Sequence, residues 1–358
     1  MSIICASPRL DIAVPTYGNI TGGHTPRFHP IQASWSGSIF SRGSANINGI
    51  EVADPFSGYM SGLAAGGEWK LYCAGGSFWY MMDKENSSHL QERSYQLVDK
   101  TCMWEVLLTQ KVFEGMTTVG DLLQALADGA ELVSLIGVNK LIDPQDTMDD
   151  MGSGDTTAER ETYTVSNSSY LAEVNRILSW YGYVVYADPA DQNNLTILAP
   201  LSTPARGLVE IASTDFNLLG AQFTIDYGGI HSDVVVASNE TGKGAAVGAS
   251  MVGQSLTAYR EYVASGYNIS KRFNPLFATV YRVTNLKLKD VALAMLRTDR
   301  RAAQTLVITS TTILQSPLWK DIYWVDKNGN GGTWRVTGFN VSLAGGTSGQ
   351  MSLECMPV

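Results

Sequence analysis

The sequence contains few charged residues, few cysteines and no long hydrophobic run. Asp, Glu, Lys and Arg make up only 16% of its 358 residues, whereas soluble domains usually contain about 25%. Low charge, together with 35 glycines and a hydrophobic content of 44%, is typical of β-rich proteins with many turns and of surfaces buried in assemblies. The length predicts two or three domains.

The four cysteines, Cys5, Cys73, Cys102 and Cys355, form no CxxC pair, so their spacing excludes a zinc ribbon or a redox motif. We expect free, buried thiols, as in a protein that folds in a reducing cytoplasm. The N-terminal residues lack the basic start and apolar run of a signal peptide. No stretch is long and apolar enough to predict a transmembrane segment.

The formal net charge of −9 argues against binding nucleic acid through a general basic surface. The charge is nevertheless uneven along the chain. Basic residues outnumber acidic ones from Arg260 to Arg301, and acidic residues dominate from Asp143 to Glu161. Opposite potentials of this kind could bring two copies together, and two ordinary solvated surfaces would give the same pattern.

The sequence lacks the residue spacings that are typical of catalytic and metal-binding motifs. The motif HExxH is absent, and no two histidines have helical ligand spacing. In Gly58–Gly62 the serine lies one position away from its place in a nucleophile elbow, and Gly242–Gly248 fits neither phosphate-loop spacing. The sequence therefore predicts no catalytic residue, no cofactor and no metal. The four histidines are His24, His29, His89 and His231.

One segment, Asp326–Gly331, matches the first half of a calcium loop, with oxygen ligands at positions one, three and five and glycine at position six. The twelfth position, which needs a bidentate acid, is Thr337. The segment also lies between two aromatic strand candidates, where Asn and Gly supply the positive φ that a hairpin turn requires. We therefore interpret it as a turn, an interpretation that tight calcium binding in a titration would contradict.

A helix followed by a hairpin is expected between Ser168 and Pro200. Ser168 is a suitable N-cap, and apolar residues then recur at helical spacing down one face as far as Tyr181. The runs Tyr183–Tyr186 and Leu195–Leu198 predict two strands joined by a turn.

Hydrophobic patterning predicts further elements along the chain. A second helix should start near Thr118 and a third should run from about Lys287 to Gln304. Residues 143–162 and Thr241–Ser255 are expected to be loops, whereas the alternation through Ala221, Phe223 and Ile225 predicts a strand with one buried face. The other expected strands are Trp69–Cys73, Ser77–Met81, Val106–Val112, Asp233–Ala237, Leu306–Ser310, Ile322–Val325, the run around Trp334 and Phe339, and Met351–Cys355.

From residue 112 onward, the order of these elements resembles the baseplate hub proteins of phage tails, the late control protein D-like family, which is similar to the base of type VI secretion spikes. The resemblance covers about two-thirds of the chain and is one of pattern and order. It rests on Phe113–Leu123, Tyr170–Leu178, Gly182–Val185, Leu195–Leu198, Asp290–Ala303, Leu306–Ile308, Trp334–Val336 and Met351–Leu353.

The resemblance implies an α+β, mainly β fold with two tail-tube-like β-barrel domains and a helix-containing domain between them. The corresponding boundaries are 1–112 for the first β-rich domain, 113–204 for the middle domain with its acidic loop at 143–162, and 205–358 for the second barrel with a helical insertion around 255–304.

The resemblance also implies a non-enzymatic function. Three chains would form a ring that stacks on the hexameric tail tube and on the threefold central spike, thereby resolving a symmetry mismatch. Such a hub lies in the virion, is assembled in the host cytoplasm with the tube, spike and other baseplate proteins, and encloses part of the channel for genome ejection without sequence-specific nucleic-acid binding. An acidic bore would let DNA slide, and the net charge permits one.

Two other functions remain open at this point. One is a carbohydrate-active or cell-wall-degrading β-protein, which a peptidoglycan cleavage assay would detect. The other is a peripheral tail-tip component. For the hub, the candidate subunit or tube contact is Arg297, Arg300 and Arg301.

Overall fold

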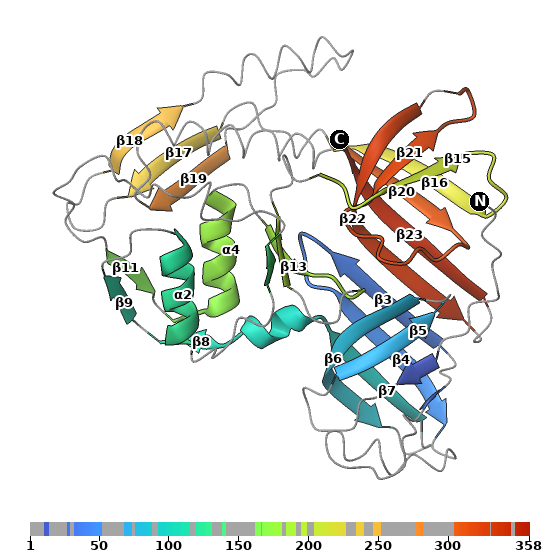
Figure 1. Ribbon diagram of the computed structural model, residues 1–358, viewed down its shortest axis with the longest axis horizontal. Coiled ribbons are helices and arrows are strands. Elements are labelled where there is room, and N and C mark those ends of the chain that lie inside the picture. The colour runs from blue at the N-terminus through green and yellow to red at the C-terminus, as the bar shows by residue number, and fades with distance from the viewer. Residues whose placement is uncertain are drawn as a thin grey trace.

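The computed structural model describes residues 11–13, 27–28, 32–51, 68–73, 76–87, 92–109, 111–114, 119–130, 138–140, 162–165, 167–180, 184–190, 195–198, 204–226, 234–239, 246–251, 276–281, 304–329, 331–344 and 348–358. The protein is mainly β, as the sequence predicts, with a large sheet beside a smaller part that contains the helices (Figure 1).

Thirteen strands pair in the large sheet, in the order β16-β20-β23-β22-β3-β4-β7-β6-β5-β1-β2, with β21 also paired to β22 and β15 to β21. Their bounds are β1 (Asp11–Ala13), β2 (Arg27–Phe28), β3 (Gln32–Ser38), β4 (Ser44–Glu51), β5 (Glu68–Cys73), β6 (Gly76–Ser87), β7 (Glu92–Val98), β15 (Leu208–Ala212), β16 (Leu218–Ile225), β20 (Gln304–Ser310), β21 (Asp321–Val325), β22 (Gly331–Ala344) and β23 (Ser348–Pro357).

The two ends of the chain meet where β3 pairs with β22. The pairing is antiparallel and continuous from Ala33 opposite Leu343 to Ser38 opposite Gly338. Buried apolar side chains from both halves form one core cluster, in which Phe78 contacts Trp35 and Phe339 at ring-centroid distances of 5.6 and 5.7 Å. The described strands of the two halves thus share one sheet and one core, and the arrangement as two barrels stays a prediction.

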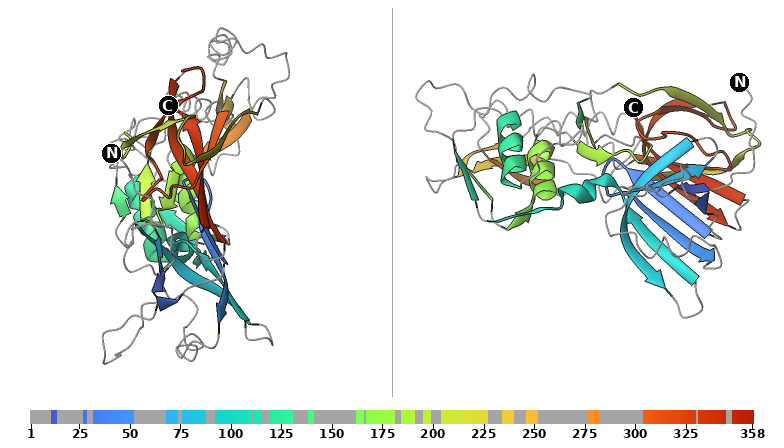
Figure 2. Two further views of the ribbon diagram at one scale, coloured as in Figure 1. Left: turned by 90° about the vertical axis from the view of Figure 1, so that its right-hand side faces the viewer. Right: turned by 60° about the horizontal axis from the view of Figure 1, so that its bottom comes forward.

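The helical part lies beside the sheet, and η1 (Lys100–Trp104) leads into it from β7 (Figure 2). It contains α2 (Val119–Gly129), α4 (Tyr170–Trp180) and short strands in small sheets: β8 (Leu107–Leu108) with β12 (Ser168–Ser169), β9 (Lys111–Glu114) with β11 (Thr162–Val165), β10 (Val138–Lys140) with β14 (Leu195–Leu198) and β13 (Val184–Ala187), and β17 (Val234–Asn239) with β18 (Ala246–Met251) and β19 (Leu276–Tyr281).

The helix–hairpin prediction is confirmed, with one correction at its start. The strands β13 and β14 pair as expected, and α4 buries Val174, Ile177 and Leu178. Its N-cap, however, is Ser169 rather than Ser168, because the Ser169 Oγ accepts a hydrogen bond from the Ala172 N–H at 3.2 Å. Ser168 and Ser169 also pair as β12 with β8, which holds the backbone extended until the helix begins at Tyr170.

Three other predictions also need comment. Val106–Val112 is not one strand, because β8 and β9 are separate strands that pair with β12 and β11. The expected loop Thr241–Ser255 contains β18, which pairs antiparallel to β17 even though small residues favour strands weakly. Two expected elements lie almost entirely outside the described residues. They are the helix Lys287–Gln304, of which only Gln304 is described, and the acidic loop 143–162, of which only Thr162 is described.

The hairpins of the large sheet are confirmed. β5 pairs with β6, β21 with β22 and β22 with β23. Met351, Leu353 and Cys355 are buried and alternate with more exposed residues, as their spacing predicts. None of the described helices is long and apolar enough to cross a membrane.

Candidate assembly surface

The residues singled out from the sequence lie mostly outside the described part of the chain. Arg297, Arg300 and Arg301 fall there, as do the four histidines. Among the described residues, no group of three or more His, Cys, Asp or Glu could hold a metal ion. Cys102 and Cys355 are free thiols, and burial raises the pKa of both, so neither is an activated nucleophile.

The partial calcium motif forms a tight turn between β21 and β22. The Asp326 Oδ1 accepts a hydrogen bond from the Asn328 N–H at 2.8 Å, and the Asp326 carbonyl accepts one from the Gly329 N–H at 3.0 Å. Gly329 has a φ of +81°, which glycine adopts without strain. These contacts are those of an Asx-type hairpin turn.

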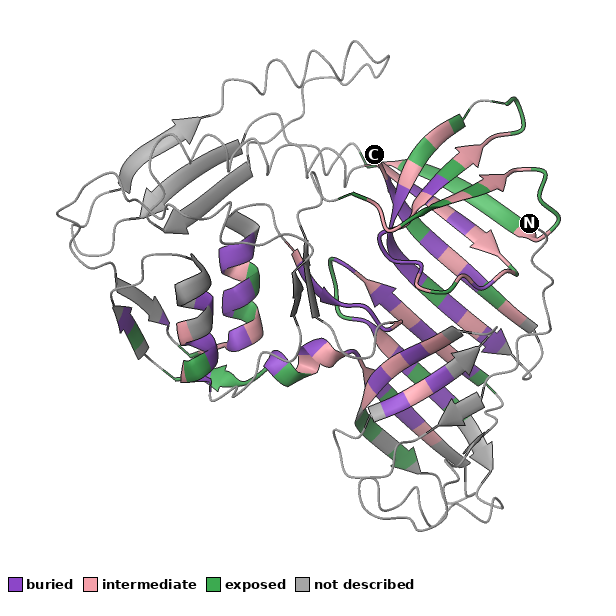
Figure 3. Cartoon of the chain, viewed as in Figure 1, coloured by how far each residue is buried: buried purple, intermediate pink, exposed green. Residues whose placement is uncertain are grey.

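The described structure leaves apolar residues uncovered at one end of the large sheet. β16 pairs only with β20, and β15 only with β21, so each has an unpaired edge among the described strands. The expected buried face of β16 is mostly exposed, since Ala221 is exposed and Phe223 retains 49% of its accessible surface. Leu219, at the β-bulge before this face, retains 56%. The strand was predicted correctly, but the described chain covers this face only in part, mainly where the Trp334 ring meets the Phe223 ring. Green on β16 marks this exposure (Figure 3).

We call this region the β15–β16 rim and define its apolar members as Leu208, Phe216, Leu219 and Phe223, which are all exposed. Phe216, in the turn between the two strands, retains 90% of its surface. Large apolar side chains beside unpaired strand edges promote aggregation of a monomer and are typical of interaction sites.

The electrostatic character of the rim is acidic. Glu210, Asp215 and Asp226 are exposed along it, and the sequence from Leu208 to Asp226 contains no Lys or Arg. The Asp215 Oδ2 accepts a hydrogen bond from the Ala212 N–H at 2.9 Å, which fixes the turn between β15 and β16. A partner with positive charge would therefore be favoured here.

The solvent-facing positions of β3, β22, β23 and β20 are polar except for Val307, and they are almost uncharged. They alternate with the buried residues and align across strands, as where Asn340 lies opposite Ser36 and Ser352. Without Lys or Arg at these positions, the face cannot bind phosphates through counterion release. The positions are Ser34, Ser36, Ser38, Asn340, Ser342, Gln350, Ser352, Glu354, Thr305, Val307 and Thr309.

A buried joint attaches the turn after β13 to the large sheet. Tyr186 belongs to the sheet's core cluster, and the Pro189 carbonyl accepts a hydrogen bond from the Trp79 N–H at 2.6 Å. The Asp188 carboxylate, whose side chain is fully buried, forms an ion pair with the Arg206 guanidinium just before β15. This joint fixes the position of the chain that leads into the rim.

A second cluster supports the joint from the other side. The Trp319 carbonyl accepts a hydrogen bond from the Arg206 N–H at 2.8 Å, and the Arg335 guanidinium lies 4.8 Å from the centre of the Trp319 ring. Arg335 also contacts Asp321 at 2.8 Å. The rim strands thus extend from a rigid, well-packed base, which pre-organises their exposed edges for binding.

No family model matches the sequence, and no curated protein matches it. Solved structures do. The chain is similar to a tail protein from Neisseria meningitidis MC58, with a TM-score of 0.62 and 14% identity over 98% of this chain and 97% of that one. It is also similar to the 43 kDa tail protein of prophage MuSo2 from Shewanella oneidensis, with a TM-score of 0.61 and 13% identity over 98% and 96% of the two chains.

A third similar structure is the c3393 protein of E. coli, a type VI secretion component described as structurally similar to the T4 bacteriophage tail proteins gp27 and gp5. It has a TM-score of 0.54 and 13% identity over 98% of this chain and 77% of that one. The chain has the fold of phage tail proteins. The resemblance drawn from the order of sequence elements is therefore confirmed. The structural likeness also covers the first hundred residues, which contributed no motif to that resemblance.

Proposed function

We propose that this tail-protein-fold chain is a structural, non-enzymatic hub of a phage tail or phage-like injection machine. The observation that carries the proposal is the likeness of the fold to tail proteins over 98% of the chain. An assembly role also accounts for the rim, since an exposed apolar strand edge is stabilised once a partner covers it.

In its finer form, the proposal is a homotrimer in the virion that links a hexameric tail tube to a threefold spike and encloses part of the DNA channel. A ring of three chains presents threefold symmetry to the spike, and two similar domains per chain would present pseudo-sixfold symmetry to the tube. The likeness to the E. coli protein, itself similar to gp27 and gp5, supports this form. The same basis supports assembly in the host cytoplasm with other baseplate proteins.

Arg297, Arg300 and Arg301 stay our candidate contact with a neighbouring subunit or the tube. Their positive charge would be attracted by acidic surfaces such as the rim. Reversing the three charges should weaken assembly, and intact assembly of that variant would remove these residues from the interface.

Electron microscopy of the purified protein, alone and with its candidate spike protein, tests the hub proposal. We expect a threefold ring with a pseudo-sixfold face. Discrete monomers in both samples would contradict it and would favour a peripheral tail-tip component instead. Cleavage of peptidoglycan by the purified chain would contradict the non-enzymatic part of the proposal.

A further inference from the structure

The polar surface of the large sheet continues beyond the four strands described above. β4 and β7 follow β3 in the sheet, and their described solvent-facing positions are again polar except for Val98. We call the combined surface the polar face. β4 and β7 add to it Ser44, Asn46, Asn48, Ser94, Gln96 and Val98. The polar face crosses the pairing of β3 with β22, so both halves of the chain contribute to it.

The polar face is almost free of charge. Among the solvent-facing side chains that the structure describes on these six strands, none is Lys or Arg, and Glu354 is the only acid. Soluble domains usually contain about 25% charged residues, so a surface of this extent would ordinarily carry several. The exposed Asp83 and Lys84 on β6, the strand after β7 in the sheet, mark the border of the face.

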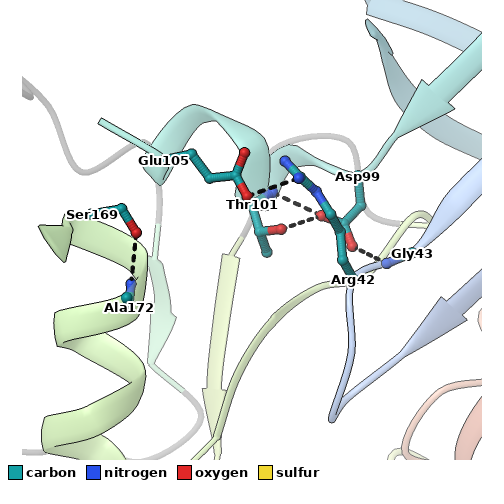
Figure 4. A network of polar contacts seen from close by, with 7 residues as sticks. All are labelled: Arg42, Gly43, Asp99, Thr101, Glu105, Ser169 and Ala172. Carbon is teal, nitrogen blue, oxygen red and sulfur yellow. Dashed lines mark hydrogen bonds and ion pairs between the residues drawn. The ribbon is translucent and has the colours of Figure 1, made fainter. Parts of the chain in front are cut away.

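Two arginines next to the polar face in the chain are held in ion pairs. Arg42, in the loop between β3 and β4, contacts the Glu105 carboxylate at 2.8 Å (Figure 4). Arg335, on β22, is buried, lies 4.8 Å from the centre of the Trp319 ring and contacts Asp321 at 2.8 Å. Neither guanidinium therefore supplies an unpaired positive charge to the face.

Short side chains in matched rows make up much of the polar face. One row crosses four strands and consists of Thr309, Ser352, Asn340 and Ser36. The hydroxyl oxygens of Thr309 and Ser352 lie 3.0 Å apart in a hydrogen bond, and the Ser36 Oγ donates to the Ser44 carbonyl at 3.3 Å. Because these hydroxyl groups bond within the sheet, they lie close to its surface and do not extend toward a ligand.

The composition of the polar face is unlike that of a binding site. The cores of protein interfaces are enriched in aromatic residues, Met and Arg and depleted in Ser. Surfaces that bind nucleic acid carry Lys and Arg, which replace the counterions of the phosphates, and sites for small molecules are lined mainly by apolar and aromatic side chains. The polar face consists mainly of Ser, Thr, Asn and Gln, so it favours none of these ligands.

A surface that binds nothing tightly suits a passage through which a polyanion moves. Resting on the proposed function, we propose that the polar face is the wall of the DNA channel. Bases on such a wall would bind the phosphates and slow the DNA, whereas many acids would repel it at the entrance. A neutral wall of hydroxyl and amide groups does neither. The bore of the hub is then neutral rather than acidic, and both halves of each chain line it.

The test adds positive charge to the polar face of the full chain. The wall variant carries Asn46→Lys and Asn340→Lys. The matched control carries Thr109→Lys, just after β8, and Thr214→Lys, in the turn between β15 and β16, which both lie away from the face. All four positions are exposed, so both variants should keep the fold. Light scattering coupled to size-exclusion chromatography gives the mass of each assembly, and thermal unfolding checks that each variant is folded.

Each preformed ring is then mixed with linear duplex DNA or with a covalently closed duplex circle, and binding is measured by fluorescence anisotropy at low salt. A closed circle has no end and cannot enter a bore, whereas the outer surface of the ring can bind it. The wall variant should bind linear duplex at least about tenfold more tightly than the wild type, and it should bind the circle no better than the wild type does. The control should bind both forms equally.

Three outcomes overturn the wall while the wild-type ring leaves the hub proposal intact. A wall variant that binds the circle as tightly as the linear duplex has its lysines outside the bore, and one that binds neither has them out of reach of DNA. A wall variant that no longer assembles, although the control does, places the polar face in the contact between copies. A wild type that is monomeric at every concentration, alone and with the spike protein, contradicts the hub proposal itself.

Discussion

The carboxylate of Asp188 and the guanidinium of Arg206 form an ion pair that joins the turn after β13 to the start of β15. The Asp188 side chain is fully buried and that of Arg206 is 23% exposed. Removing Arg206 would leave the buried Asp188 carboxylate without the cation that pairs with it, although it would keep the hydrogen bond from the Ala190 N–H. Arg206→Ala should therefore lower the free energy of unfolding by about 3 kcal/mol, as measured by urea denaturation.

The exposed pair Arg42–Glu105 provides the control, because its side chains retain 32% and 50% of their surface. Arg42→Ala should cost at most about 1 kcal/mol, since water screens the charges. Equal losses in the two variants would show that the Asp188–Arg206 pair does not fasten the joint.

Gly37 lies where β3, β22 and the turn after β13 come together. A Cβ at this position would lie 2.5 Å from the Phe339 Cε1 and 3.1 Å from the Pro189 Cδ. Gly37→Ala should therefore lower the free energy of unfolding by about 1–3 kcal/mol through overpacking. Gly220→Ala on β16, where nothing lies within 4 Å of the added carbon, should change it little. A neutral Gly37→Ala would mean that the Phe339 ring and the turn can both move aside.

The sequence predicts elements best where alternation or helical spacing comes from burial within the element. Leu195–Leu198 is a strand with the predicted bounds, and Met351, Leu353 and Cys355 face the core. β10 was not anticipated, because three residues carry little pattern and its parallel pairing with β14 joins segments far apart in the chain. β18 was missed for a similar reason, since its pairing with β17 decides its structure rather than its own small residues.

The rim shows what an alternating pattern leaves undecided. The alternation through Ala221, Phe223 and Ile225 predicts an apolar face. It does not predict whether other residues of the same chain cover that face. In the structure, the Phe223 ring meets the Trp334 ring edge-on at 5.6 Å but stays half exposed. Apolar periodicity predicts which side chains favour burial. The folded structure is needed to show whether they pack inside the same chain or remain exposed. The signal that could have indicated the rim is the absence of Lys and Arg from Leu208 to Asp226.

The buried carboxyl of Asp99 should make stability depend on pH. Burial raises its pKa above the ordinary value of 3.8, although hydrogen bonds from Thr101 and Gly43 oppose the shift. A carboxyl with a raised pKa in the folded state contributes stability that is complete below the unfolded pKa and is lost as the pH rises through the folded pKa. The unfolding free energy of wild type minus that of Asp99→Asn should therefore fall as the pH rises above about 4.

Denaturant unfolding of both proteins across the acidic range up to neutral pH measures this difference. Glu105→Gln, at the exposed end of the same network, serves as the control for general charge effects. If the wild type did not lose stability relative to Asp99→Asn as the pH rises, the pKa of Asp99 would not be raised in the folded state.

The turn at Asp326–Gly329 should be stabilised by its own hydrogen bonds and not by calcium. Its Asp326 Oδ1 already accepts the Asn328 N–H, and the oxygens of a hairpin turn are not gathered around one point as metal ligands are. Calorimetric titration should give no calcium-binding heat, and calcium should leave the melting temperature unchanged. Gly329→Ala should nevertheless cost about 1 kcal/mol, because an alanine is strained at a φ of +81°. Tight calcium binding that is lost in Asp326→Ala would instead make this segment a metal site.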